Sequence, residues 1–179
     1  MEILVASDIH GRLERARRLQ KAIEDLKPDR IVLLGDYLYN GPRNGVPEDY
    51  DPMAVCEILN LYAEKIIGVR GNCDSRIDES LLKFPLEDSR VVELDSRRCN
   101  LIHGDLINEK TISLSKGSWL LFGHTHVHML KAASGAYWLN PGSISFPKMG
   151  QEPSFAWLSP KKASILRLSD YSPISTLSF

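Results

Sequence analysis

Hydrophobic residues follow a strand and helix alternation in the first half of this chain. Apolar runs near residues 2–7, 30–35 and 65–70 have the length and composition of buried strands. Between them, segments near 12–27 and 53–63 carry apolar residues at helical spacing. These positions are Leu13, Ala16, Leu19, Ile23 and Leu26 in the first segment, and Val55, Ile58, Leu59 and Tyr62 in the second. The pattern predicts the order βαβαβ, which is typical of α/β domains.

The second half of the chain consists of short apolar runs with few helical segments. These runs lie near residues 91–94, 99–103, 118–123, 128–133, 136–140, 154–158 and 163–168. Because short turns join successive runs, we expect antiparallel pairing there. The two halves together predict two mixed β-sheets packed against each other with helices outside. The Ser-rich segment 168–179 is expected to form a peripheral tail, strand-like near 174–177.

Composition describes an ordinary single domain spanning residues 1–179. With 179 residues, of which 43% are hydrophobic, the chain can bury a full core. The net charge of −1 and the scattered basic residues argue against general binding to nucleic acid polymers or anionic membranes. No apolar run approaches membrane-spanning length and no export signal is evident, so we expect a cytoplasmic protein. A homo-oligomer is compatible with the sequence.

The three cysteines do not form a Cys-x-x-Cys pair, which argues against a disulfide framework and a structural zinc site. Cys56 and Cys99 are expected to be buried apolar residues. Cys73 differs, because it lies within a cluster of polar residues.

Residue types that bind metals gather in five short clusters, each after an apolar run. The clusters are Asp8-Ile9-His10-Gly11, Gly35-Asp36, Gly71-Asn72-Cys73-Asp74, His103-Gly104-Asp105 and Gly123-His124-Thr125-His126. If the strand that precedes Asp8 stays extended, Asp8 and His10 project to the same face. Each cluster alone is explained by a turn or a helix cap. Together they predict a two-metal hydrolase, because unpaired buried carboxylates and imidazoles would cost several kcal/mol without an ion.

The order of these clusters resembles that of the calcineurin-like metallophosphoesterases, from Asp8 to about Pro147. The short chain, the Gly71-Asn72-Cys73-Asp74 cluster and the stretch Asn140-Pro141-Gly142-Ser143 are most similar to the compact YfcE-like phosphodiesterase branch. The resemblance implies a four-layer αββα sandwich of two mixed β-sheets flanked by helices. It also implies one metal on Asp8, His10 and His126, a second on Asn72, His103 and His124, and Asp36 as the bridge between them.

The activity implied by this resemblance is hydrolysis of a small phosphodiester by in-line attack of a hydroxide held between two divalent metals. Oxygen and imidazole ligands suit manganese, iron, cobalt, nickel or zinc, and we expect manganese. The residues expected at the reaction centre are Asp36, Asn72, Cys73 and Asp74. A phosphomonoesterase, a nuclease and a metal-binding scaffold similar to the retromer subunit are the alternatives. The complete ligand set argues against the scaffold, and the lack of a basic stripe argues against the nuclease.

Several neighbouring residues allow two interpretations. Cys73 stands where most members of the family have a histidine, and we expect it to line the phosphate pocket rather than act as the nucleophile. Asp74 either hydrogen-bonds a ligand or caps a helix that starts near Ser75. His128 is expected to have a structural role or to lie at the surface.

Three further residues are candidates for substrate contacts. Arg12 could contact a phosphate from a helix N-terminus, or it could be an ordinary surface arginine. Asn140 and Ser143 lie in a Pro-Gly turn, which is itself a sufficient explanation for both. The irregular loop 37–52 follows Asp36 directly and is a candidate wall of the site.

Overall fold

The computed structural model describes residues 1–106 and 111–179. Its helices are α1 (Leu13–Leu26), α2 (Pro52–Asn60) and α3 (Arg76–Leu81), and a 3-10 turn spans Ala63–Lys65. The first two agree with the predicted helices, although α2 ends at Asn60 and does not reach residue 63. Among the described residues, no helix combines the length and apolar character needed to cross a membrane.

The larger sheet has seven strands in the order β12-β11-β10-β1-β2-β3-β4. In chain order these are β1 (Ile3–Ala6), β2 (Arg30–Leu33), β3 (Ile66–Val69), β4 (Leu86–Glu87), β10 (Ser154–Ser159), β11 (Lys162–Arg167) and β12 (Pro173–Ser178). Strands β1, β2 and β3 are parallel, as the helical crossovers between them require. Their carboxyl ends therefore meet at one edge.

The smaller sheet has five strands in the order β5-β6-β7-β9-β8. They are β5 (Ser89–Leu94), β6 (Arg97–Ile102), β7 (Trp119–Leu121), β8 (Met129–Ala133) and β9 (Ala136–Asn140). The expectation of antiparallel pairing holds for the hairpins β5–β6 and β8–β9. It is wrong for β7, which runs parallel to both β6 and β9. The connection from β6 to β7 is long enough to return the chain for parallel pairing.

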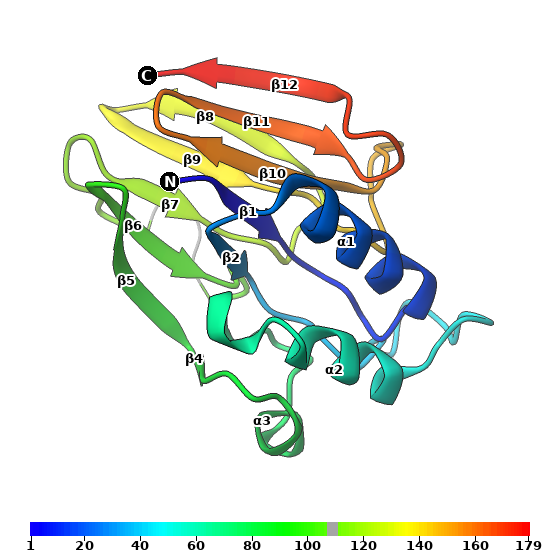
Figure 1. Ribbon diagram of the computed structural model, residues 1–179. Coiled ribbons are helices and arrows are strands. Elements are labelled where there is room, and N and C mark those ends of the chain that lie inside the picture. The colour runs from blue at the N-terminus through cyan, green and yellow to red at the C-terminus, as the bar shows by residue number, and fades with distance from the viewer. Residues whose placement is uncertain (107–110) are drawn as a thin grey trace.

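Strand periodicity divides the core between the two faces of the larger sheet. Leu4 and Leu33 face the helices and pack with α1 residues such as Leu19, whereas Val5 faces the smaller sheet and packs with residues such as Trp119. Figure 1 shows α1 and α2 covering one side of the strands β1 and β2. The predicted mixed α/β sandwich with flanking helices is confirmed.

The C-terminal segment contains the strand expected near 174–177, which is β12 at the edge of the larger sheet. Phe179 packs edge-on against Trp119, with ring centroids 4.8 Å apart. The segment thus lies at the periphery and also contributes to the core between the sheets. Cys56 and Cys99 are buried, as the sequence predicts.

Candidate metal centre

The predicted ligands follow the carboxyl ends of five strands. Asp8 and His10 follow β1, Asp36 follows β2, Asn72 follows β3, His103 follows β6, and His124 and His126 follow β7. The two sheets pack face to face, so these loops gather at one edge of the sandwich. Five segments far apart in the sequence thereby deliver their side chains to one place.

The backbone of these loops is left-handed rather than extended. The φ angles are 59° at Asp8, 53° at His10, 57° at Asp36, 62° at His124 and 59° at His126. The expectation of an extended strand end was therefore wrong, although the side chains do converge. A left-handed residue other than glycine costs about 1–2 kcal/mol, and such strain concentrates at functional sites.

Side chains from the end of β9 and the turn after it hold two of these loops in place. The hydroxyl of Ser143 donates to the Asp8 carbonyl at 2.9 Å, and that of Ser145 donates to the Ile9 carbonyl at 2.6 Å. Asn140 donates to the Gly123 carbonyl at 2.8 Å and accepts from the Gly142 amide at 2.9 Å. Asn140 and Ser143 thus position the ligand loops, in agreement with their interpretation as turn residues.

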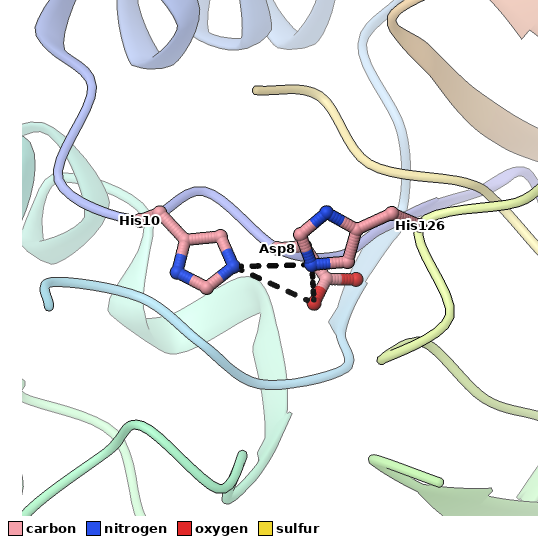
Figure 2. Close-up of side chains that lie close together, drawn as sticks. All are labelled: Asp8, His10 and His126. Carbon is pink, nitrogen blue, oxygen red and sulfur yellow. Dashed lines mark hydrogen bonds and ion pairs between the residues drawn. The ribbon is translucent and has the colours of Figure 1, made fainter. Parts of the chain in front are cut away.

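Asp8, His10 and His126 form the first predicted ligand set (Figure 2). The Nε2 atoms of His10 and His126 lie 3.3 Å apart, and Asp8 Oδ1 lies 3.3 Å from the His126 Nε2. Both Nδ1 atoms contact carbonyl oxygens, at 2.8 Å for His10 and 2.7 Å for His126, which assigns the hydrogen to Nδ1. Two Nε2 lone pairs and a carboxylate oxygen therefore face one point.

This arrangement fits a cation. Asp8 Oδ1 is buried and has no hydrogen-bond partner among the described residues. Burial lowers the pKa of His10 despite the nearby carboxylates, so its imidazole is neutral at pH 7, the form that binds metals. A divalent ion would satisfy the carboxylate and relieve the repulsion between the two lone pairs.

His103, Asn72 and His124 form the second predicted set. His103 Nε2 lies 3.0 Å from Asn72 Oδ1 and 3.2 Å from His124 Nδ1. The other ring nitrogen of His103 contacts the Leu34 carbonyl at 2.7 Å, so Nε2 is directed into the site.

Asp36 lies between the two sets. Its Oδ2 is 3.6 Å from the His10 Nε2 and 3.5 Å from the His103 Nε2. Burial would raise the pKa of Asp36, but its contact with His103 outweighs burial and lowers the pKa to about 2. Burial would likewise lower the pKa of His103, but Asp36 raises it to about 9. The Asp36 carboxylate therefore lies close to one histidine of each ligand set, which is the position that a bridging ligand requires.

Asp74 does not cap helix α3, so that interpretation is wrong. Ser75 is the N-cap, in a reciprocal pair with Asp78. The Asp74 carboxylate instead accepts the backbone amides of Asp36 at 2.9 Å, Tyr37 at 2.8 Å and Gly71 at 2.7 Å. Burial raises its pKa to about 6. Asp74 therefore supports the Asp36 loop from behind.

Cys73 lies beside the ligands. Its sulfur, a ring nitrogen of His10 and a carboxylate oxygen of Asp36 all lie within 4.8 Å of one another. Burial, followed by the charge of Asp36, raises the pKa of the thiol to about 12. A protonated thiol is a weak nucleophile. These features agree with a residue that lines the site.

The remaining predicted residues lie outside the two ligand sets. Arg12 pairs with Asp49 at 2.8 Å, and its guanidinium lies 5.6 Å from the centre of the Phe146 ring. His128 is half-buried, and its amide donates to Gln151 at 2.7 Å. Arg12 is therefore already paired with a carboxylate. His128 lies outside the ligand sets, as expected for a residue with a structural role.

A cleft of about 900 Å³ opens over the centre. Loop 37–52 forms one wall of it, as expected from its position after Asp36. Besides predicted ligands and Cys73, the cleft is lined by Tyr39, Gly41, Pro42, Arg43, Asn44, Thr125 and Lys148. The first five lie in the wall that the sequence predicts and Thr125 lies in a predicted ligand cluster, whereas nothing in the sequence marks Lys148.

We expect Gly71→Ala to release bound metal and abolish turnover. A Cβ at Gly71 would overlap the side chain and backbone nitrogen of Asp36, so the carboxylate would have to move. Metal content after gel filtration measures the effect. Gly150→Ala is the control for a strained glycine position away from the site, because its φ is 70° but its Cβ would have no neighbour within 4 Å, and it should retain metal. Normal metal content in Gly71→Ala would show that Asp36 need not hold its position.

Known proteins are similar to this chain in sequence and in fold. The calcineurin-like phosphoesterase superfamily domain matches residues 1–163. Phosphodiesterase YfcE of Escherichia coli strain K12 is 39% identical over 177 residues, which cover 98% of this chain and 96% of YfcE. A solved structure of the E. coli phosphoesterase YfcE superposes with a TM-score of 0.95 at 38% identity, covering 99% of both chains. Probable metallophosphoesterase YsnB of Bacillus subtilis is 26% identical over 167 residues, 89% of this chain and 84% of YsnB.

Proposed function

Because this chain belongs to the calcineurin-like phosphoesterase superfamily, we propose that it is a dinuclear-metal phosphodiesterase acting on a small phosphodiester. The observation that carries the proposal is the position of Asp36, within 3.6 Å of a histidine from each ligand set. The similarity to phosphodiesterase YfcE supports the choice of a diester over a monoester.

The chain's own residues prepare a rigid centre. Backbone carbonyls orient the imidazoles of His10, His103 and His126, which fixes the direction of each Nε2 atom. Asp74 holds the loop that presents Asp36. Two divalent cations, when bound there, would lower the pKa of a coordinated water and neutralise charge on the phosphate oxygens. The absence of thiolate among the proposed ligands suits manganese, which we propose as the native metal, with nickel, cobalt, iron and zinc as alternatives.

The alternative activities fit less well. A non-catalytic scaffold would not need to retain all seven ligand-type residues around an open cleft. A phosphomonoesterase remains the closest competitor, because the same ligands serve both reactions. We also propose a cytoplasmic location, and a homo-oligomer is compatible with the proposal.

The test is a comparison of bis(4-nitrophenyl) phosphate with 4-nitrophenyl phosphate on manganese-loaded protein. We expect the diester to be hydrolysed much faster, because its single negative charge is readily held by two cations. Removal of metal by a chelator should abolish the activity, and addition of manganese should restore it. Equal rates, or faster hydrolysis of the monoester, would contradict the proposal.

Substitutions of Cys73 test its role as a lining residue. Cys73→Ser should leave hydrolysis of the aryl diester largely intact. Cys73→His should raise monoesterase activity relative to diesterase activity, because a general acid contributes about 10²–10⁴ in rate to a poor leaving group. Steady-state kinetics with both substrates measures the ratio. Loss of diester hydrolysis in Cys73→Ser, with both metals still bound, would show that the thiol takes part in the chemistry.

A further inference from the structure

An apolar groove of about 540 Å³ adjoins the metal cleft. Its lining residues are Leu38, Tyr39, Tyr50, Pro52, Met53, Cys73, Ser75, Ile77, Asp78 and Leu81. Two of them, Tyr39 and Cys73, also line the metal cleft. The groove and the cleft are therefore neighbours that meet at these two side chains.

Residues of α2, of α3 and of the loop that precedes α2 line this groove. Figure 1 shows where these two helices lie in the fold. Asn60 on α2 donates to the Leu81 carbonyl at the end of α3 at 2.9 Å, which fixes the two helices together. One wall of the groove is thus built on two helices that contact each other directly.

The groove exposes three large apolar or aromatic side chains. Ile77 is 70% exposed, Met53 is 52% exposed and Tyr39 is 46% exposed. Asp78, a polar residue in the lining, is already engaged, because it accepts the Ser75 amide in the cap of α3. A contiguous apolar surface beside a polar cleft is a candidate ligand site.

On the Cys73 side, the junction between cleft and groove is lined by small groups. Cys73 has a short side chain, and a Cβ added to Gly41 would lie 3.4 Å from its sulfur. The metal cleft, by contrast, carries buried ligands and the cationic side chains of Arg43 and Lys148 on its rim. A molecule that spans both must therefore have an anionic centre and an apolar arm.

We propose that this groove is a specificity subsite that binds an aromatic ester arm of the phosphodiester substrate. The inference rests on the proposed function, which places the phosphate at the metal centre. Tyr39 and Tyr50 offer ring faces and edges, and Met53 offers a thioether, all of which pack well against an aromatic ring. The subsite gives a diester with an aromatic arm an advantage over one with two small alkyl arms.

The test uses dibenzylphosphinate and dimethylphosphinate, whose phosphorus–carbon bonds the enzyme cannot hydrolyse. Isothermal titration calorimetry on manganese-loaded protein gives each dissociation constant. We expect the dibenzyl compound to bind at least about tenfold more tightly. Met53→Ser and Ile77→Ser should each weaken its binding by about three- to tenfold and leave dimethylphosphinate unchanged. Val91→Ser, at a residue of β5 that is 57% exposed and outside the groove lining, should change neither.

Two results would overturn the subsite. One is equal affinity of the two phosphinates in the wild-type protein, and the other is equal weakening of both by the groove substitutions. Failure of the proposed function is distinguishable, because it would appear as no hydrolysis of bis(4-nitrophenyl) phosphate while the dibenzyl preference persists. Failure of the subsite alone would leave hydrolysis intact and remove the preference.

Discussion

Asp36→Ala should remove nearly all hydrolysis of aryl phosphodiesters. Asp36 is the carboxylate closest to both ligand sets, so its loss should weaken both metal sites at once. Substitution of residues that only support metal ligands typically costs 10–100-fold in affinity or activity, and a shared ligand should cost more than about 100-fold. The measurement is kcat/KM with bis(4-nitrophenyl) phosphate, together with the metal content of the purified variant.

The control for this variant is Asp105→Ala, because Asp105 is exposed and lies two residues after His103. It removes a carboxylate near the site without removing a proposed ligand, and it should retain metal and most activity. Turnover at the wild-type rate in Asp36→Ala would contradict the assignment of Asp36 as the bridge.

His126→Ala should cause the second large loss, and His124→Ala should also weaken metal binding. His126 is only 4% exposed, and its Nε2 lies 3.3 Å from both Asp8 Oδ1 and the His10 Nε2. Removing it leaves the buried Asp8 carboxylate with one imidazole fewer to share a cation. We expect a fall in kcat/KM of more than about 100-fold, with weaker retention of manganese in equilibrium dialysis.

His128→Ala is the matched control, because it removes an imidazole two residues further along the same segment. His128 is half-buried and belongs to neither ligand set, so both metal content and rate should stay near the wild-type values. If His128→Ala proved the most damaging of the three substitutions, the register of the Gly123-His124-Thr125-His126 cluster as a ligand segment would be wrong.

The sequence identifies candidate ligands that the structure brings together, because the residue types and their places after apolar runs are local features. Once β1, β2 and β3 are recognised as parallel, their carboxyl ends must meet, and Asp8, Asp36 and Asn72 must come together. The same reasoning does not predict the left-handed backbone at Asp8 and His10. This loop is held by hydrogen bonds from residues distant in sequence, among them the hydroxyls of Ser143 and Ser145.

Long-range pairing explains the other differences. The parallel placement of β7 between β6 and β9 depends on where the chain returns after β6, which local periodicity does not determine. The sequence allows Asp74 either to cap α3 or to hydrogen-bond near the site, because Asp and Ser are both common N-cap residues and Ser75 follows directly. Only the contacts of its carboxylate with the Asp36 and Tyr37 amides decide between them.

The most direct measurement is anomalous scattering from a manganese-soaked crystal, recorded at an energy where manganese contributes strongly. The account predicts two anomalous peaks, one among Asp8, His10 and His126 and one among Asn72, His103 and His124, with Asp36 between them. A single peak outside both ligand sets, or no peak in protein that still hydrolyses the diester, would contradict the dinuclear centre.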